Sequence, residues 1–252
     1  MADQTLRVML AEDNPVNQTF LRHLLESLGH AVTVAEHGAR ALELVATEDF
    51  DVALMDMQMP VMDGETATRL IRMLPGERAS LPVLALTADC PTENGPRFAA
   101  AGVTAVLPKP ITLARLAQAL RTVTGAPSAA PAVPDLEEGE AQPVLDPTYL
   151  EDMRQWVGNE ALQALLATAP DSFLAELAAI QAGWTAGDLR AVRENAHRLK
   201  GAAGSVGCRR LADAAQVLQK IGAITPDGTN SLERLRAETM AAIDATATWT
   251  PT

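Results

Sequence analysis

The hydrophobic positions in the first half of the chain alternate between short continuous apolar runs and longer stretches with helical spacing. The apolar runs predict strands at Leu6–Leu10, Ala31–Ala35, Val52–Met55, Pro82–Thr87 and Ala105–Leu107. Apolar residues three and four positions apart predict helices from Pro15 to Gly29 and at Ala39–Thr47, Glu65–Leu74 and Thr112–Val123. Because strands and helices alternate, right-handed crossovers are expected to produce a five-stranded parallel sheet with helices on both faces.

The second half of the chain shows only the helical period. It predicts helices at Pro147–Trp156, Glu160–Gln181, Leu189–Gly204, Arg209–Ile221 and Ser231–Thr246, with a plain loop at Thr225–Asn230. This all-helical pattern favours a small antiparallel bundle. In the third of these helices, the apolar stripe expected to face the core consists of Leu189, Val192, Ala196, Leu199, Ala203 and Val206.

Prolines interrupt two of the helical segments. Gly95-Pro96 lies within Pro91–Ala101, and Pro170 lies within Glu160–Gln181. Proline lacks the backbone N–H and its ring clashes with the preceding helical turn. We therefore expect a poor helix in the first segment and a kink or break in the second.

The segment between the two halves has the composition of a tether. Residues 124–145 are rich in Ala and Pro, include the acidic run Asp135–Glu140 and contain no Lys or Arg. The pattern therefore predicts one domain at 1–123, a flexible linker at 124–145 and a second domain at 146–252. A tether of this length would keep the two domains at an effective concentration of about 1 mM.

Charge and cysteine content narrow the classes of partner. A formal net charge of −12 disfavours nucleic acid or an anionic membrane surface as the main ligand. Cys90 and Cys208 form neither a metal-ligand pair nor a disulfide framework, which favours a reducing compartment. No segment is long and apolar enough to cross a bilayer. These features predict a cytoplasmic protein without a nucleic-acid partner.

Polar residues gather where the predicted strands end. Glu12 and Asp13 follow the first strand, Asp56 ends the third, Thr87 ends the fourth and Lys109 follows the fifth. An isolated aspartate before a turn is usually only a capping residue. Here the carboxyl ends of parallel strands bring all five residues to one edge, where ligands bind in such sheets. Three carboxylates suit Mg²⁺, and a hydroxyl and an ammonium group suit phosphoryl oxygens, so the set predicts chemistry at a phosphoryl group.

The motifs around these residues resemble the receiver domain of two-component response regulators. They are Ala-Glu-Asp-Asn-Pro-Val-Asn-Gln at Ala11–Gln18, Leu-Met-Asp-Met-Gln-Met-Pro-Val-Met-Asp-Gly at Leu54–Gly64, Leu-Thr-Ala at Leu86–Ala88 and Leu-Pro-Lys-Pro at Leu107–Pro110. The resemblance implies a flavodoxin-like fold and phosphorylation of Asp56. It also implies a Mg²⁺ ion bound by Asp13, Asp56 and the main-chain carbonyl of Gln58, with Glu12 helping through water.

The same resemblance implies that Thr87 and Lys109 contact the phosphoryl group, and the first motif is most similar to receivers attached to hybrid sensor kinases. One residue departs from the pattern. Val106 stands two residues before Pro108, where receivers that switch an output face usually carry Tyr or Phe. With the interrupted helix after Thr87, this favours a receiver that passes its phosphoryl group on.

His197 is the candidate reactive residue of the second half. A lone histidine on a helix is usually a core or solvated residue. However, the run from Ala196 to Gly207, Ala-His-Arg-Leu-Lys-Gly-Ala-Ala-Gly-Ser-Val-Gly, resembles the histidine phosphotransfer (HPt) domain of multistep phosphorelays. The resemblance implies that His197 is phosphorylated, that Lys200 assists through its charge and that Gln219 hydrogen-bonds the imidazole. The glycines, with Arg193 one turn before the histidine, would let a receiver approach.

Together these resemblances predict a phosphorelay intermediate. A histidine kinase would phosphorylate Asp56, the group would pass to His197, and a downstream response regulator would take it, with possible docking of the receiver on the HPt domain of the same chain. The chain contains no ATP-binding kinase domain. Three alternatives stay open: flow in reverse to a hydrolysing sink at Asp56, a phosphorylation-gated binding module without transfer, and a Mg²⁺-dependent phosphatase. The last is disfavoured because Gln58 stands where such enzymes typically place a second aspartate.

Overall fold

The computed structural model describes residues 5–87, 91–109, 111–125, 143–224 and 226–250. These residues form two compact units, one containing a sheet with its helices and the other containing the helices from Pro147 onward. Most of the predicted linker, residues 126–142, lies outside the described residues, as does Cys90. Within the described part of the chain, no helix is long and apolar enough to span a bilayer.

The first unit is built on five parallel strands. They are β1 (Arg7–Ala11), β2 (Ala31–Ala35), β3 (Val52–Asp56), β4 (Val83–Thr87) and β5 (Ala105–Pro108), in the spatial order β2-β1-β3-β4-β5. The continuous apolar runs of β3 and β4 are buried throughout, as expected for strands covered on both faces. The predicted five-stranded parallel sheet is confirmed.

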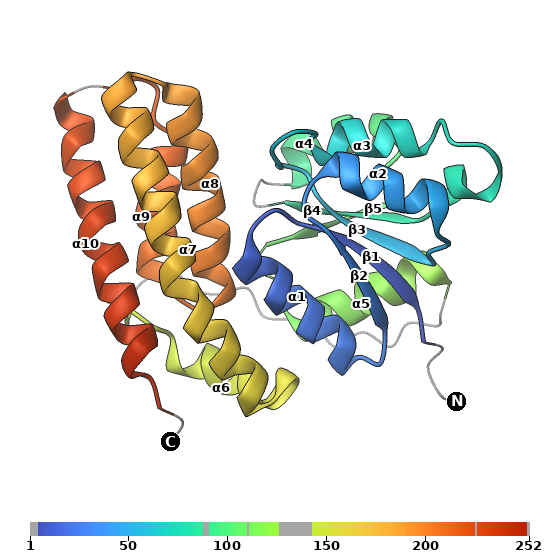
Figure 1. The fold of residues 1–252 in the computed structure, drawn as a ribbon, viewed down its shortest axis with the longest axis horizontal. Helices are drawn as coiled ribbons and strands as arrows, with labels where there is room; N and C mark the ends of the chain where they lie inside the picture. Colours follow the sequence, from blue (N-terminus) through green and yellow to red (C-terminus); the bar gives the residue numbers. More distant parts are fainter. Residues whose placement is uncertain (1–4, 88–90, 110, 126–142, 225, 251–252) are drawn as a thin grey trace. The chain divides into compact units, whose positions relative to one another are not determined.

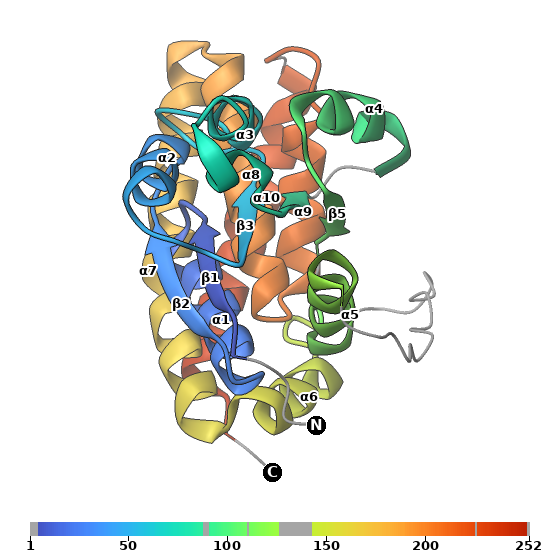
Figure 2. The same cartoon turned by 90° about the vertical axis from the view of Figure 1, so that its right-hand side faces the viewer.

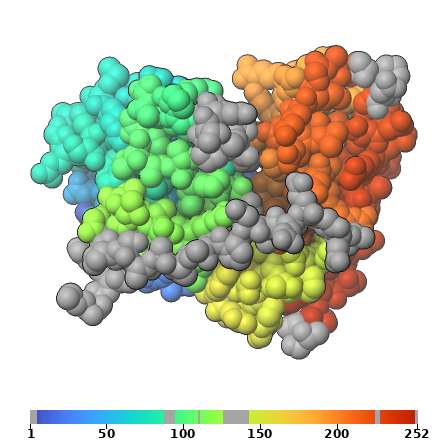
Figure 3. All heavy atoms as spheres, turned by 180° about the vertical axis from the view of Figure 1, so that it is seen from behind, coloured from blue at the N-terminus to red at the C-terminus, as the bar shows by residue number. Residues whose placement is uncertain are grey.

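Helices cover both faces of this sheet. The helices are α1 (Pro15–Ser27), α2 (Gly38–Thr47), α3 (Gly64–Ile71), α4 (Pro91–Ala101) and α5 (Leu113–Thr124), with a short 3₁₀ helix at Gly76–Ser80. Helices α2, α3 and α4 lie on one face, and α1 and α5 lie on the other (Figures 1 and 2). On the face of the first unit seen in Figure 3, α5 forms part of the outer surface.

The strand order determines where a site can form. The chain moves from β1 to β2 on one side and then returns to β3 on the other side of β1. This reversal is the topological switch point, where the loops after β1 and β3 diverge and leave room for a ligand. The residues that follow β1 and end β3 are therefore placed to contact a ligand.

The second unit is a helical bundle. Its helices are α6 (Pro147–Val157), α7 (Asn159–Ala186), α8 (Leu189–Ser205), α9 (Arg209–Gln219) and α10 (Pro226–Thr248). Helix α7 packs on α8 and α10, α9 packs on the same two helices, and α6 packs on α7. The predicted stripe of α8 is buried at Val192, Ala196, Leu199, Ala203 and Val206, with Leu189 half-buried at the start of the helix. Asp188 caps α8 by accepting from the Ala191 N–H at 3.0 Å.

The expected poor helix at Pro91–Ala101 and the expected break at Pro170 were both wrong. Helix α4 runs unbroken from Pro91 to Ala101, and α7 runs unbroken through Pro170 to Ala186. In each helix a buried apolar side chain lies close after the proline: Phe98 in the first and Phe173 in the second. One missing backbone hydrogen bond is outweighed when tertiary packing buries the apolar face of the helix.

The predicted loop at Thr225–Asn230 was also wrong, because α10 already begins at Pro226. Proline is well suited to the first position of a helix, where its missing N–H has no partner to lose. The contact that holds this first turn is not local in sequence. A Cβ on Gly228 would lie 2.5 Å from the Trp184 ring of α7, so this turn packs closely against the bundle.

Gly64 offers a test of the packing behind β3. A Cβ at this first residue of α3 would lie 2.1 Å from the Asp56 carbonyl oxygen, which is a backbone atom and cannot move aside. We expect Gly64→Ala to lower the free energy of unfolding of the first unit by about 2 kcal/mol, because overpacking forces backbone shifts. Gly95→Ala is the control, since no atom lies within 4 Å of its added Cβ.

Calorimetry is the appropriate measurement for this pair, because the tryptophans Trp156, Trp184 and Trp249 all lie in the second half of the chain and do not report on the sheet. The expected result is a lower transition temperature for the first unit in Gly64→Ala only. Equal transition temperatures for the two variants would contradict the prediction.

Candidate functional site

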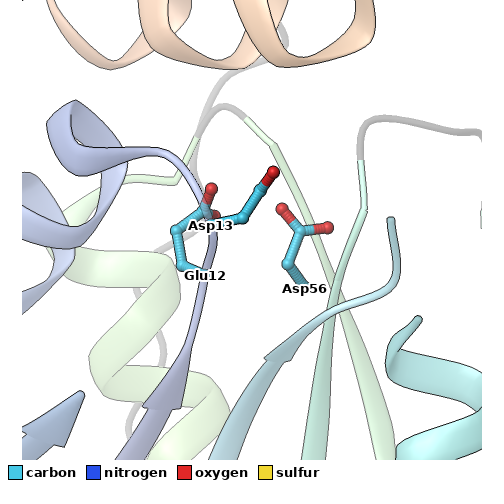
Figure 4. Close-up of side chains that lie close together, drawn as sticks. All are labelled: Glu12, Asp13 and Asp56. Atoms are coloured by element: carbon cyan, nitrogen blue, oxygen red, sulfur yellow. The ribbon is translucent and has the colours of Figure 1, made fainter. Parts of the chain in front are cut away.

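The carboxyl ends of β1 and β3 carry a cluster of three carboxylates. Glu12 and Asp13 directly follow β1, and Asp56 is the last residue of β3. Each residue offers an oxygen atom, and these three atoms lie within 4.8 Å of one another. Figure 4 shows the side chains of Asp13 and Asp56 converging between the two strand ends. The sheet thus brings together acidic residues that are far apart in the sequence.

Lys109 neutralises part of this negative charge. Its Nζ lies 2.5 Å from Asp56 Oδ2 and 2.8 Å from Glu12 Oε2. Burial alone would lower the pKa of Lys109, but the charges of Asp56 and Glu12 and their hydrogen bonds raise it above its ordinary value. The ammonium group therefore stays charged and bridges two of the three carboxylates.

The ends of β4 and β5 place Lys109 and Thr87 side by side. The Thr87 carbonyl accepts a hydrogen bond from the Lys109 N–H at 2.7 Å, and Thr87 is in register with Pro108. On the other side of Asp56, the Gln58 N–H donates to Asp56 Oδ1 at 3.0 Å. The predicted Thr87, Lys109 and Gln58 are therefore all close to Asp56, although the role of the Gln58 carbonyl as a metal ligand stays a prediction.

The donor set of the cluster suits a hard divalent cation. Three oxygen atoms within 4.8 Å of one another can be bridged by one ion, and carboxylates with open water positions are the ligands that Mg²⁺ prefers. Without a cation, three close carboxylates repel one another, and Lys109 offsets only part of that repulsion. The residues present therefore fit a magnesium ion.

One contact at this site was missed by the sequence analysis. Gln18, in the second turn of α1, donates from Nε2 to the Glu12 carbonyl at 2.6 Å. This bond holds the backbone that carries both Glu12 and Asp13. Gln18 is part of the quoted Ala11–Gln18 motif, but its contact depends on how α1 folds back beside the end of β1, which the motif alone does not show.

The second candidate site lies within the bundle. His197 of α8 has its Nδ1 atom 2.9 Å from Nε2 of Gln219, the last residue of α9. Lys200 is three residues further along α8, so it lies on the next turn of the same side of the helix. The three residues predicted for this site are thus near one another, with Gln219 in direct contact with the imidazole.

Neighbouring residues hold α8 in place around His197. Arg198 Nε is 3.1 Å from Glu176 Oε1 of α7, and the Arg198 guanidinium also donates to the Asn195 side chain. Burial raises the pKa of Glu176, and the charge of Arg198 opposes that shift. This ion pair ties α8 to α7 one residue after His197.

The other three histidines have structural settings. His37 is the N-cap of α2, where its Nδ1 accepts from the Arg40 N–H at 3.0 Å. His30 Nδ1 accepts from the Leu6 N–H at 3.4 Å, and His23 lies 3.6 Å from Glu26. Cys208 is buried and free, and burial raises the pKa of its thiol to about 12.

Comparison with known families assigns both units to a class. Residues 8–121 match the response regulator receiver domain, and residues 160–247 match the Hpt domain. The chain is therefore a receiver domain followed by an Hpt domain, the modules of a two-component phosphorelay. We refer to the two units as the receiver unit and the Hpt unit from here on.

Curated relatives combine the same modules in longer chains. The chain is 34% identical over 252 residues to the sensor protein GacS of Pseudomonas syringae pv. syringae, covering 94% of this chain and 28% of that protein. It is 32% identical over 216 residues to the aerobic respiration control sensor protein ArcB of Escherichia coli K12, covering 85% of this chain and 28% of ArcB. The chain is similar to the C-terminal parts of such hybrid sensor kinases and spans less than a third of their length.

Among solved structures, the receiver domain of a sensor histidine kinase from Pseudomonas aeruginosa is 36% identical to this chain. The match covers 49% of this chain and 100% of that domain, with a TM-score of 0.46. That structure is described with a magnesium ion coordinated in its active-site cleft.

The ion pairs of Lys109 predict how the receiver unit responds to divalent cations. We expect Lys109→Ala to lower the free energy of unfolding by about 3 kcal/mol in the absence of divalent cations, because the variant leaves close carboxylates uncompensated. Added Mg²⁺ should then raise the unfolding temperature of Lys109→Ala more than that of the wild type, since the ion replaces the missing charge.

Calorimetry with and without MgCl₂ measures both effects. Lys220→Ala, which removes one positive charge from the Hpt unit, is the matched control and should respond to Mg²⁺ as the wild type does. Equal stabilisation of Lys109→Ala and wild type by Mg²⁺ would show that Lys109 and the ion do not share the cluster.

Proposed function

We propose that this chain is a phosphorelay intermediate in which Asp56 accepts a phosphoryl group from a histidine kinase and passes it to His197. A separate response regulator would then take the group from His197. The observation that supports this most strongly is the presence of two candidate acceptors in one chain. Asp56 lies beside Lys109 and two further carboxylates, and the His197 imidazole is contacted at one nitrogen by the Gln219 amide.

The receiver unit would supply the first acceptor. An Asp56 carboxylate oxygen attacks phosphorus, the bond from phosphorus to the donor nitrogen breaks, and the donor imidazole leaves with the electron pair. Lys109 Nζ already lies 2.5 Å from Asp56 Oδ2, so a phosphoryl group added to Asp56 would place new anionic oxygens beside that ammonium. Thr87, adjacent to Lys109 through the 2.7 Å backbone hydrogen bond, would offer its hydroxyl to the same oxygens.

Magnesium would complete the receiver site. Asp13, Asp56 and the main-chain carbonyl of Gln58 are the proposed ligands, with Glu12 acting through water, because the three carboxylates can surround one ion. When bound, the ion would neutralise charge on the phosphoryl oxygens and on the acids around them.

The Hpt unit would supply the second acceptor. Gln219 contacts Nδ1 of His197, so Nε2 is the proposed attacking atom, with its lone pair available when the proton of the neutral ring is on Nδ1. Attack by the Nε2 lone pair forms the N–P bond, the P–O bond to Asp56 breaks, and its electron pair returns to the carboxylate. Lys200, one turn along the same side of α8, would offset the charge of the incoming phosphoryl group.

Val106 supports transfer over output switching. It is a partly buried residue of β5 that packs against the core cluster of the sheet. A small branched side chain has no large ring to swing between a buried and an exposed position when Asp56 is phosphorylated. The small Val106 side chain therefore favours a receiver that transfers its phosphoryl group to another domain.

The proposed division of the chain follows from these roles. The receiver domain would occupy 1–123 and the phosphotransfer domain 146–252, with 124–145 as the linker that allows the receiver to reach the HPt domain of its own chain. The partners would be a histidine kinase and a downstream receiver, and the phosphorelay would operate in the cytoplasm.

Labelled acetyl phosphate with Mg²⁺ tests the order of transfer, because acyl phosphates are alkali-labile and phosphohistidine is acid-labile but alkali-stable. In the wild type we expect acid-labile label to appear on His197 after label on Asp56. Asp56→Asn should abolish labelling of both residues, and His197→Gln should leave only alkali-labile label on Asp56.

His23→Gln is the matched histidine control and should behave as the wild type. Acid-labile, alkali-stable label on the Asp56→Asn protein would overturn the proposed order. Label that remains on Asp56 in the wild type would support a gated binding module. Rapid release of phosphate from a phosphorylated His197 by way of Asp56 would support a sink.

A further inference from the structure

Arg193, one turn from His197, contacts the backbone after α9. It lies on α8 one turn before His197, where a free cation would be expected to attract a phosphoryl group. Instead its guanidinium donates twice to the Ile221 carbonyl, at 2.8 Å from Nε and 2.5 Å from Nη2. The side chain therefore ties α8 to the segment directly after α9.

The C-terminal end of α9 is held only weakly by its own backbone hydrogen bonds. Its last backbone hydrogen bonds are long, 3.3 Å from the Lys220 N–H to the Gln216 carbonyl and 3.3 Å from the Ile221 N–H to the Leu218 carbonyl. Carbonyl groups at a helix C-terminus are stabilised by a cation, both through hydrogen bonds and through the helix dipole. Arg193 provides that cation from the neighbouring helix.

Gln219 is the residue that this end of α9 carries toward His197. Its Nε2 lies 2.9 Å from His197 Nδ1, while its Oε1 is buried and makes no hydrogen bond with any residue in the described part of the chain. A side chain anchored through a single hydrogen bond depends on its backbone for its position. The placement of the last turn of α9 thus determines whether the amide reaches the ring.

We propose that Arg193 is a positioning residue for phosphoryl transfer at His197, holding the Ile221 carbonyl so that the end of α9 keeps the Gln219 amide on Nδ1. This proposal rests on the proposed function of His197 as a phosphoryl acceptor. It assigns Arg193 a role through Gln219, two residues before Ile221, and not through direct contact with the phosphoryl group.

The amide matters because it selects the tautomer of the imidazole. When the amide nitrogen donates to Nδ1, a neutral ring carries its proton on Nε2 and cannot attack from that atom. When the Gln219 amide rotates by 180°, its Oε1 accepts a hydrogen bond from the Nδ1–H of the ring. Nε2 then has the lone pair that forms the N–P bond. Both orientations require the Gln219 side chain to reach Nδ1, so both depend on the end of α9.

A double-mutant cycle separates positioning from general support of the fold. The rate of label transfer from phosphorylated Asp56 to His197 is measured in Arg193→Ala, Gln219→Ala and the double variant. We expect Arg193→Ala to slow transfer about tenfold to a hundredfold, the fold-change that corresponds to the loss of a hydrogen bond to a charged group. The double variant should be no slower than Gln219→Ala, because Arg193 acts through that residue.

Arg190→Ala is the matched control, since Arg190 lies one turn earlier on α8 and pairs with Glu194 on the exposed side of the helix. It should transfer at the wild-type rate. A double variant that shows the full product of the two single effects would overturn the proposal, as would an unchanged rate in Arg193→Ala. Fluorescence of Trp156 and Trp184 verifies that the Hpt unit of each variant is folded.

Nitrogen NMR of the imidazole rings in the full chain provides a readout that does not require transfer. The chain has four histidines, and the His197 signals are those lost in His197→Gln. We expect the Nδ1 shift of His197 to move toward that of a solvated histidine in both Arg193→Ala and Gln219→Ala, and to stay close to wild type in Arg193→Lys. An Nδ1 shift that changes in Gln219→Ala but not in Arg193→Ala would overturn the proposal.

The transfer assay and the nitrogen shifts distinguish failure of the proposed function from failure of the proposal for Arg193. Absence of acid-labile label on His197 in the wild type would refute the proposed function, while the nitrogen shifts would still decide whether Arg193 holds Gln219 on the ring.

Discussion

The charge balance at the carboxyl ends of β1 and β3 is the constraint on which the receiver unit depends. Three carboxylates within 4.8 Å of one another are unfavourable unless a cation lies between them, and Lys109, directly after β5, supplies part of the positive charge. Lys109 can do so because its backbone is held by the Thr87 carbonyl at the end of β4. The register of the parallel strands therefore also determines the relative positions of the site residues.

The Hpt unit has a different requirement, which is to hold the imidazole of one helix in a defined orientation. Arg198 ties α8 to α7 through Glu176, and Arg193 ties it to the end of α9 through the Ile221 carbonyl. Gln219 then contacts Nδ1 of His197. Two arginines within one turn of the histidine thus act mainly on the helices around it, although their positive charge suggests a direct role with phosphate.

The elements that sequence analysis placed wrongly share a physical cause. Pro96 and Pro170 each remove a backbone hydrogen bond, but Phe98 and Phe173 bury enough apolar surface in the folded units to keep both helices continuous. The first turn of α10 forms because Gly228 packs on Trp184, a residue far away in the sequence.

The sequence by itself determined the parallel sheet, the helical bundle and the candidate residues for chemistry, because hydrophobic periodicity and strand-end motifs are local properties of the chain. It placed Asp56 at the end of a buried strand and His197 beside an apolar stripe. Only the tertiary structure decided which partners these residues have: Lys109 between Asp56 and Glu12, Gln18 on the Glu12 carbonyl, and Arg193 on the Ile221 carbonyl. Such contacts depend on strand register and helix packing, which bring together residues that no short stretch of sequence relates.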